Sequence, residues 1–158
     1  MTSTLPPTLY DWVGGIDRIE ALFAAFYARV PADPILGPVF AEMSPQHFRT
    51  VAQFVAEVLG GPKLYSGGGT RGHSSMVAKH LARHLTQEQR KRWMQLLLET
   101  ADSLGLPDDP EFRSALVAYL EWGSRLAVMN SATASNPIDP SASMPKWGWG
   151  EVKGPYTG

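Results

Sequence analysis

The segment that decides the fold has the sequence GGIDRIEALFAAFYARVP and spans residues 14–31. Its apolar residues recur at intervals of three and four, the spacing that lines one face of an α-helix. They are Ile16, Ile19, Leu22, Phe23, Phe26, Tyr27 and Val30. Pro31 ends the predicted helix, because proline has no N–H for the helical hydrogen bond. The pattern therefore predicts a helix over residues 16–30 with one face buried in a core.

Similar signals recur along the first 130 residues, and alternating runs typical of β-strands do not. Capping residues followed by proline at 33–34 and 44–45 predict a short helix through 35–36 and a longer one that ends at 60–62. The Gly-rich stretch 63–73 predicts a loop. The fold class is therefore predicted to be all-α.

Three further helices follow that loop. Ser74 or Ser75 can cap a short helix that carries Met76, Val77, His80 and Leu81. Thr86 and Gln89 form a capping box, which predicts a long helix with Trp93 on its inner face. Asp109 and Pro110 predict the start of a last long helix. No internal repeat is evident.

Composition excludes several classes of function. The chain has 158 residues, enough for one domain with a substantial core, and 14 basic against 15 acidic residues. That balance argues against binding nucleic acid or an anionic membrane. The absence of cysteine excludes disulfides and thiolate chemistry, so any metal must use the four histidines. Residues 1–8 lack the pattern of a signal peptide, and we expect a cytoplasmic protein.

The composition changes after residue 130, where Ser, Pro, Ala and Gly dominate. We therefore divide the chain into a helical domain, residues 1–130, and an irregular tail, residues 131–158. The tail contains Trp147 and Trp149, whose exposure to water would be costly. They either dock on the helical domain or form a strip that binds a partner, as in a helical interaction module.

Three polar side chains share predicted inner faces with apolar residues: Tyr27, His47 and Trp93. A buried hydroxyl, imidazole or indole needs a hydrogen-bond partner. For each residue taken alone, an ordinary place in the core explains the pattern. Together, they could instead donate hydrogen bonds to a small ligand.

His80 and His84 are spaced as zinc ligands on one helix would be. The neighbouring Lys79 and Arg83 oppose a cation, however, and suit a ligand with anionic edges and an apolar centre. Haem has this character, because one imidazole holds its iron and its propionates favour basic residues. His80 is then the candidate ligand of the iron, and zinc remains the weaker alternative.

At this point the chain resembles the truncated haemoglobins, specifically their second group. The resemblance rests on segments that cover nearly the whole helical domain in order: 9–15, 26–30, 33–40, 60–62, 80–93, 106–112 and 119–122. It implies a two-over-two helical sandwich, with a very short first helix and a loop-rich segment before the helix that bears the iron ligand. The loop at 63–75 and the tail depart from the family pattern.

The resemblance also implies roles for particular residues. His80 corresponds to the proximal ligand of the iron of haem b. Tyr27 and Trp93 correspond to distal hydrogen-bond donors, and His47 and Val51 fall on the distal helix. Further contacts with the cofactor are expected from Phe40, Val51, Phe54, Tyr65, Arg71, Met76, Lys79 and Trp93. Charge and position, rather than the resemblance, suggest Lys79 and Tyr65 or Arg71 as candidates for the propionates.

We therefore expect a globin that reversibly binds dioxygen or another small diatomic gas at a five-coordinate ferrous iron. The alternative is a haem enzyme that performs nitric oxide dioxygenation or peroxide reduction. The chain has no nucleotide-binding motif for a reductase of its own, so turnover would need an external reductase. A homodimer is also compatible with the sequence.

Overall fold

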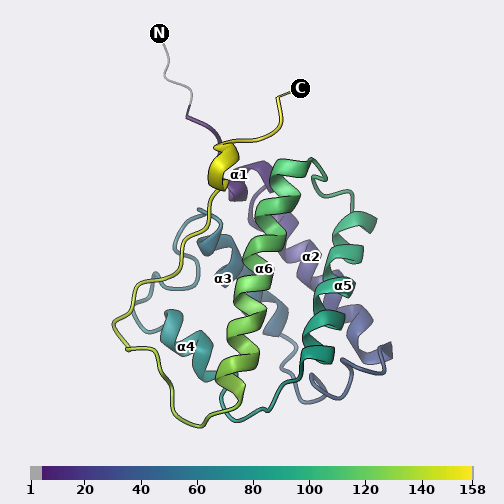
Figure 1. Cartoon of the computed structure of the whole chain (residues 1–158), viewed down its shortest axis with the longest axis vertical. Coiled ribbons are helices and arrows are strands. Elements are labelled where there is room, and N and C mark those ends of the chain that lie inside the picture. Colours follow the sequence, from purple (N-terminus) through teal and green to yellow (C-terminus); the bar gives the residue numbers. More distant parts are fainter. Residues whose placement is uncertain (1–4, 158) are drawn as a thin grey trace.

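The computed structural model describes residues 5–157, and this part of the chain contains helices but no strand (Figure 1). The α-helices are α1 (Leu9–Val13), α2 (Ile16–Arg29), α3 (His47–Val58), α4 (His73–Ala78), α5 (Gln87–Ser103) and α6 (Pro110–Ser131), with 3-10 turns η1 (Val30–Ala32) and η2 (Gly150–Val152). The all-α prediction is confirmed. None of the described helices is long and apolar enough to span a membrane. Residues 1–4 of the predicted N-terminal stretch and residue 158 lie outside the described part.

Four long helices form two packed pairs. Helix α2 packs against α3 and also against α5, and α5 packs against α6. The apolar face predicted for α2 is buried in this core, and Phe26 at its centre is 0% exposed. The two-over-two arrangement and the very short first helix expected from the sequence are therefore confirmed.

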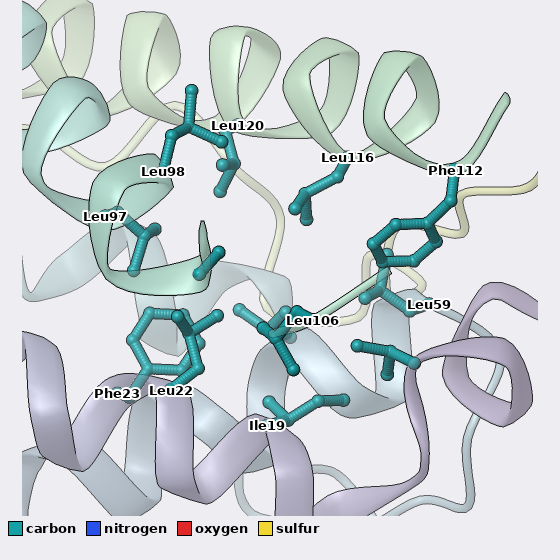
Figure 2. A pocket seen from close by; sticks show the side chains of 13 residues that line it. Ile19, Leu22, Phe23, Leu59, Leu97, Leu98, Leu106, Phe112, Leu116 and Leu120 are labelled. Carbon is teal, nitrogen blue, oxygen red and sulfur yellow. The ribbon is translucent and has the colours of Figure 1, made fainter. Parts of the chain in front are cut away.

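The centre of the core holds a small apolar cavity of about 20 Å³ (Figure 2). Figure 2 shows leucines of α5 and α6 facing Ile19, Leu22 and Phe23 of α2 across it. Its lining offers almost no polar surface, so a water molecule would find no hydrogen-bond partners there. This cavity belongs to the packing of the core and contains none of the predicted site residues.

Local capping signals place the long helices correctly. The Thr86 side chain accepts from the backbone N–H of Gln89 at 3.1 Å, and Gln89 returns the bond, which confirms the capping box. Asp109 caps α6, whose first residue is Pro110. Gly60, just beyond α3, has φ +100°, a left-handed conformation that glycine adopts without strain.

Two predicted helix starts in the first half of the chain are wrong. Residues 34–42 form successive turns rather than a short helix, because Pro38 cannot supply a helical N–H. The carboxylate of Asp33 nevertheless accepts from the backbone N–H groups of Ile35 and Leu36, as a capping residue would. Ser44 likewise caps a turn through the N–H of Gln46, and α3 begins only at His47.

The short helix α4 also differs from its prediction. It begins at His73 after Gly72, earlier than a cap at Ser74 or Ser75 would place it, and it ends at Ala78. His80 and Leu81 therefore lie in the turn beyond the helix. The backbone leaves helical geometry there, since Ala82 has φ +59° and His84 has φ +52°.

The tail returns along α4 and α3 to α1 (Figure 1). The backbone N–H of Trp147 donates to the carbonyl of Val58 at 2.9 Å, and the indole of Trp149 donates to the carbonyl of Pro7 at 2.7 Å. Both tryptophans are half-buried and pack against the core. The structure thus places these two aromatic residues on the helical domain.

Asp109 connects the start of α6 with α1, and replacing it tests how much this connection contributes to stability. One carboxylate oxygen accepts from the N–H of Phe112 at 3.1 Å, and the other accepts from the indole of Trp12 at 2.9 Å. Asp109→Ala should lower the free energy of unfolding by about 1–2 kcal/mol, since it removes a helix cap and a second hydrogen bond. Urea denaturation measures this, with the exposed neighbour Asp108→Ala as the control; equal losses in both variants would contradict it.

Candidate functional site

Tyr27 lies in the last turn of α2, at the centre of an aromatic cluster. Its ring meets that of Phe40 with centroids 5.5 Å apart and that of His47 at 5.0 Å, both edge to face. The side chain is 8% exposed. Burial raises the pKa of the Tyr27 hydroxyl, and a polar interaction with the side chain of Trp93 only partly opposes this. The hydroxyl therefore keeps its proton at neutral pH and can act as a hydrogen-bond donor.

His47 is the first residue of α3 and is half-buried. Burial lowers the pKa of its imidazole from 6.5 to about 4, with smaller contributions from the basic side chains of Lys79, His80 and Arg83. The imidazole is therefore neutral at pH 7. All three of these residues belong to the segment that directly follows α4.

Trp93 lies on α5 and is half-buried. Its ring packs edge to face on that of Phe26, with centroids 6.1 Å apart, and Phe26 in turn contacts Tyr27 at 4.8 Å. The indole N–H can only donate a hydrogen bond. Three predicted site residues, Tyr27, His47 and Trp93, thus come together from α2, α3 and α5.

His80 lies two residues beyond the end of α4. Its Nδ1 is 3.0 Å from the backbone carbonyl of Met76, one turn earlier. A carbonyl can only accept, so Nδ1 carries the proton and Nε2 keeps its lone pair for another partner. Burial lowers the pKa of His80, the bond to Met76 opposes this, and Arg83 and Lys79 lower the pKa further. The imidazole is therefore oriented, neutral and ready to bind a metal ion through Nε2.

The predicted apolar contacts are divided between two places. Phe40 belongs to the Tyr27 cluster, and Val51 lies one turn after His47 on α3; both are half-buried, as is Met76. Phe54 is instead buried, and its ring packs edge to face on Tyr65, with centroids 5.1 Å apart. Phe40, Val51 and Met76 are therefore more accessible to a ligand than Phe54.

Two of the three propionate candidates already have partners within the protein. Tyr65 is 1% exposed, and its hydroxyl shares a 2.9 Å hydrogen bond with that of Ser75. The guanidinium of Arg71 lies 4.4 Å from the centroid of the Tyr65 ring and donates to the carbonyls of Leu64 and Tyr65. Lys79 remains exposed beside His80. The geometry therefore favours Lys79 over Tyr65 and Arg71 for contact with an anionic group.

The weaker alternative, a zinc pair on one helix, does not match the structure. Helix α4 ends at Ala78, and His84 has a left-handed backbone with its N–H bonded to the carbonyl of Ser131. His80 and His84 therefore do not lie on successive turns of one helix, as a zinc pair of this spacing would require. Within residues 5–157, no group of three His, Cys, Asp or Glu side chains could hold a metal ion.

The donor set fits haem. One oriented imidazole offers Nε2 to iron, half-buried apolar side chains suit the porphyrin, and Lys79 and Arg83 supply positive charge for the propionates. A separate cluster holds the O–H and N–H groups of Tyr27, His47 and Trp93. A zinc site would need more ligands than this set provides.

Sequence reasoning missed the group that orients His80 and the residues that hold its turn. The carbonyl of Met76 could have been inferred, because it lies one helical turn before the imidazole. The left-handed conformations of Ala82 and His84 carry no signal in the sequence, since neither residue is glycine or asparagine.

Comparison with known proteins agrees with this arrangement. The family model described as bacterial-like globin matches residues 8–122. The group 2 truncated hemoglobin YjbI of Bacillus subtilis is 32% identical over 111 residues, which cover 70% of this chain and 81% of that protein. The solved group II truncated hemoglobin of Bacillus anthracis has a TM-score of 0.70 and 28% identity, covering 79% of this chain and 93% of that one.

A truncated oxygen-avid haemoglobin of Bacillus subtilis has also been solved, and it superposes with a TM-score of 0.66 and 31% identity, over 77% of this chain and 99% of that one. Fold, candidate site and sequence similarity thus lead to the same family. The chain belongs to the bacterial-like globins, as a group II truncated haemoglobin, and is a haem-binding protein.

Proposed function

We propose that the chain holds haem b through Nε2 of His80 and reversibly binds dioxygen or another diatomic gas beside Tyr27, His47 and Trp93. The observation that carries this proposal is the bond between Nδ1 of His80 and the Met76 carbonyl, which leaves the lone pair of Nε2 for the iron. Haem supplies an iron that, when ferrous, takes up and releases such a gas. The description of the Bacillus subtilis relative as oxygen-avid supports dioxygen as the ligand.

The residues on the His47 side would stabilise a gas that carries partial negative charge. The Tyr27 hydroxyl remains protonated because burial raises its pKa, and the indole of Trp93 is a permanent donor. Hydrogen bonds to a charged acceptor contribute roughly 1.5–3 kcal/mol each. Two such donors, held by packing on Phe26, would make release of the gas slow.

Lys79 and Arg83 would bind the propionates, since both are exposed and flank His80. Phe40, Val51 and Met76 would contact the porphyrin. Tyr65, Arg71 and Phe54 would instead stabilise the loop that precedes α4, through their contacts within the protein. The enzymatic alternative, the external reductase, the homodimer and the cytoplasmic location remain predictions from the sequence.

His80→Gly tests the proximal side. Loss of a residue that only hydrogen-bonds to a metal ligand typically lowers affinity by roughly 10–100-fold. His80→Gly removes the ligand itself, so its haem affinity should fall by more than this. Titrating the haem-free protein with haemin, followed at the Soret band, measures this, and added imidazole should restore the band. The matched control is His84→Gly, which removes the other histidine of this segment at a position where glycine is unstrained. Equal affinity of His80→Gly and His84→Gly would contradict the assignment.

Tyr27→Phe and Trp93→Phe test the distal side. Each should speed the dissociation of dioxygen from the reduced, haem-loaded protein by roughly 10–100-fold, because each removes one charge-assisted hydrogen bond. Stopped-flow replacement of dioxygen by carbon monoxide measures the rate. Tyr156→Phe, an exposed tyrosine in the tail, is the control and should be unchanged. The donor role is wrong if both distal variants keep the rate of the unaltered protein.

His47 makes the stability of the haem-free protein depend on pH. Its pKa is lowered to about 4 in the folded state, so the unfolded chain takes up this proton first as the pH falls from about 6.5. Folding stability should therefore decrease between about pH 6.5 and pH 4, and His47→Gln should reduce this decrease. Urea unfolding of both proteins at pH 7 and pH 5 measures the difference. An identical loss in the variant would show that His47 is not held neutral.

A further inference from the structure

Residues 131–149, here called the strap, connect the end of α6 with α1 by way of α4 and α3 (Figure 1). The family model ends at residue 122, so the strap lies outside the part that defines the family. Its hydrogen bonds to the helical domain fall on a small set of residues. Apart from bonds within the last turn of α6, the partners are Ala82, His84, Leu85, Ser74, Val58 and Pro7. The first four flank His80 in the sequence.

The strap holds the segment that follows His80 in a strained conformation. Ala82 and His84 both have positive φ, which costs a non-glycine residue on the order of 1 kcal/mol or more. Their N–H groups donate to the carbonyls of Thr133 at 2.9 Å and Ser131 at 3.0 Å. The N–H of Leu85 donates to the Ser131 hydroxyl at 2.9 Å. Such strain persists only where the surrounding contacts impose it, and here those contacts come from the start of the strap.

The strap also holds the helix that precedes His80. The side-chain amide of Asn136 donates to the carbonyl and the hydroxyl oxygen of Ser74, at 2.9 and 3.1 Å. The Ser74 hydroxyl donates to the carbonyl of Ile138 at 3.2 Å, and Asn136 Oδ1 accepts from the N–H of Ile138. Ser74 belongs to α4, the helix whose Met76 carbonyl orients His80.

The far end of the strap is fastened to the core. Trp147 packs against Tyr119 and Trp122 of α6, with ring centroids 5.7 and 5.6 Å apart. Its backbone N–H donates to the carbonyl of Val58, at the end of α3. The far end of the strap is therefore held by α3 and α6, while its first half contacts α4 and the turn that follows it.

We propose that Ser131 and Asn136 are positioning residues that hold the turn and helix around His80, and thereby keep its imidazole directed at the iron. The inference rests on the proposed function, in which Nε2 of His80 binds haem. It assigns the strap a role in haem retention and in the geometry of the iron–histidine bond.

Two substitutions test the proposal on opposite sides of His80. Asn136→Asp removes the donors to Ser74 but keeps an acceptor for the Ile138 N–H. Ser131→Ala removes the acceptor for the Leu85 N–H. Ser141→Ala is the matched control within the strap, because its hydroxyl bonds only to Asp139. Asp109→Ala controls for a general loss of stability at the other end of α6.

Three measurements apply to each variant. The rate of haem transfer from the ferric protein to excess apomyoglobin reports retention, and the iron–histidine stretching band in the resonance Raman spectrum of the ferrous protein reports the geometry of the bond. Hydrogen exchange of the haem-free protein reports the order of residues 82–85.

Asn136→Asp and Ser131→Ala should each lose haem about fivefold faster, the factor produced by losing one ordinary hydrogen bond. Both should shift the iron–histidine band, and Ser131→Ala should speed exchange at Leu85. Ser141→Ala and Asp109→Ala should leave the band and the exchange at residues 82–85 unchanged.

Two outcomes separate this inference from the proposed function. An unaltered iron–histidine band in His80→Gly would overturn the proposed function. If His80→Gly lacks the band, while both strap variants keep the band and the haem-transfer rate of the unaltered protein, only the inference about the strap is overturned. A band shift of equal size in Asp109→Ala would also overturn it, because the effect would then follow general stability.

Discussion

The burial of the apolar face of α2 is the constraint on which the rest of the structure depends. Phe26 is completely buried and contacts both Tyr27 on its own helix and Trp93 on α5. Because α2 also packs against α3, the same helix brings His47 to the ring of Tyr27. The hydrophobic effect that drives this packing is not directional, but close packing of aromatic rings allows few arrangements. The position of three hydrogen-bonding groups is therefore a consequence of the core.

The two sides of the site are stabilised in different ways. Tyr27, His47 and Trp93 project from helices of 12 to 17 residues whose faces are buried. His80 follows a helix of only six residues, which is too short to be stable by itself. Its orientation depends on the single hydrogen bond that its Nδ1 donates to the Met76 carbonyl, and on the contacts that hold α4. Substitutions in the core would therefore disturb both sides together, whereas substitutions near residues 74–85 would act mainly on His80.

Much of the fold could be predicted because its signals are local. The capping box at Thr86, the cap at Asp109 and the buried stripe of α2 each depend on residues within one or two turns. The end of α4 could not be predicted, since the conformations of Ala82 and His84 depend on carbonyls about 50 residues later in the chain. Charge and position in the loop suggested Arg71 for the propionates, but neither reveals that its guanidinium already donates to the carbonyls of Tyr65 and Leu64. The pattern of residues itself suggested His80 as the iron ligand and Tyr27, His47 and Trp93 as hydrogen-bond donors, and the resemblance to a family added their proximal and distal positions.

The bond between the Trp149 indole and the Pro7 carbonyl joins residues 142 positions apart. A chain leaves the ribosome from its N-terminus, and its early segments can begin to pack while later ones are still being made. The six α-helices are all complete by residue 131, so the helical body can assemble before the final contact exists. The contacts of residues 131–138 with residues 74–85 can therefore form only after all of these helices have been synthesised, and until then the segment around position 80 lacks that support.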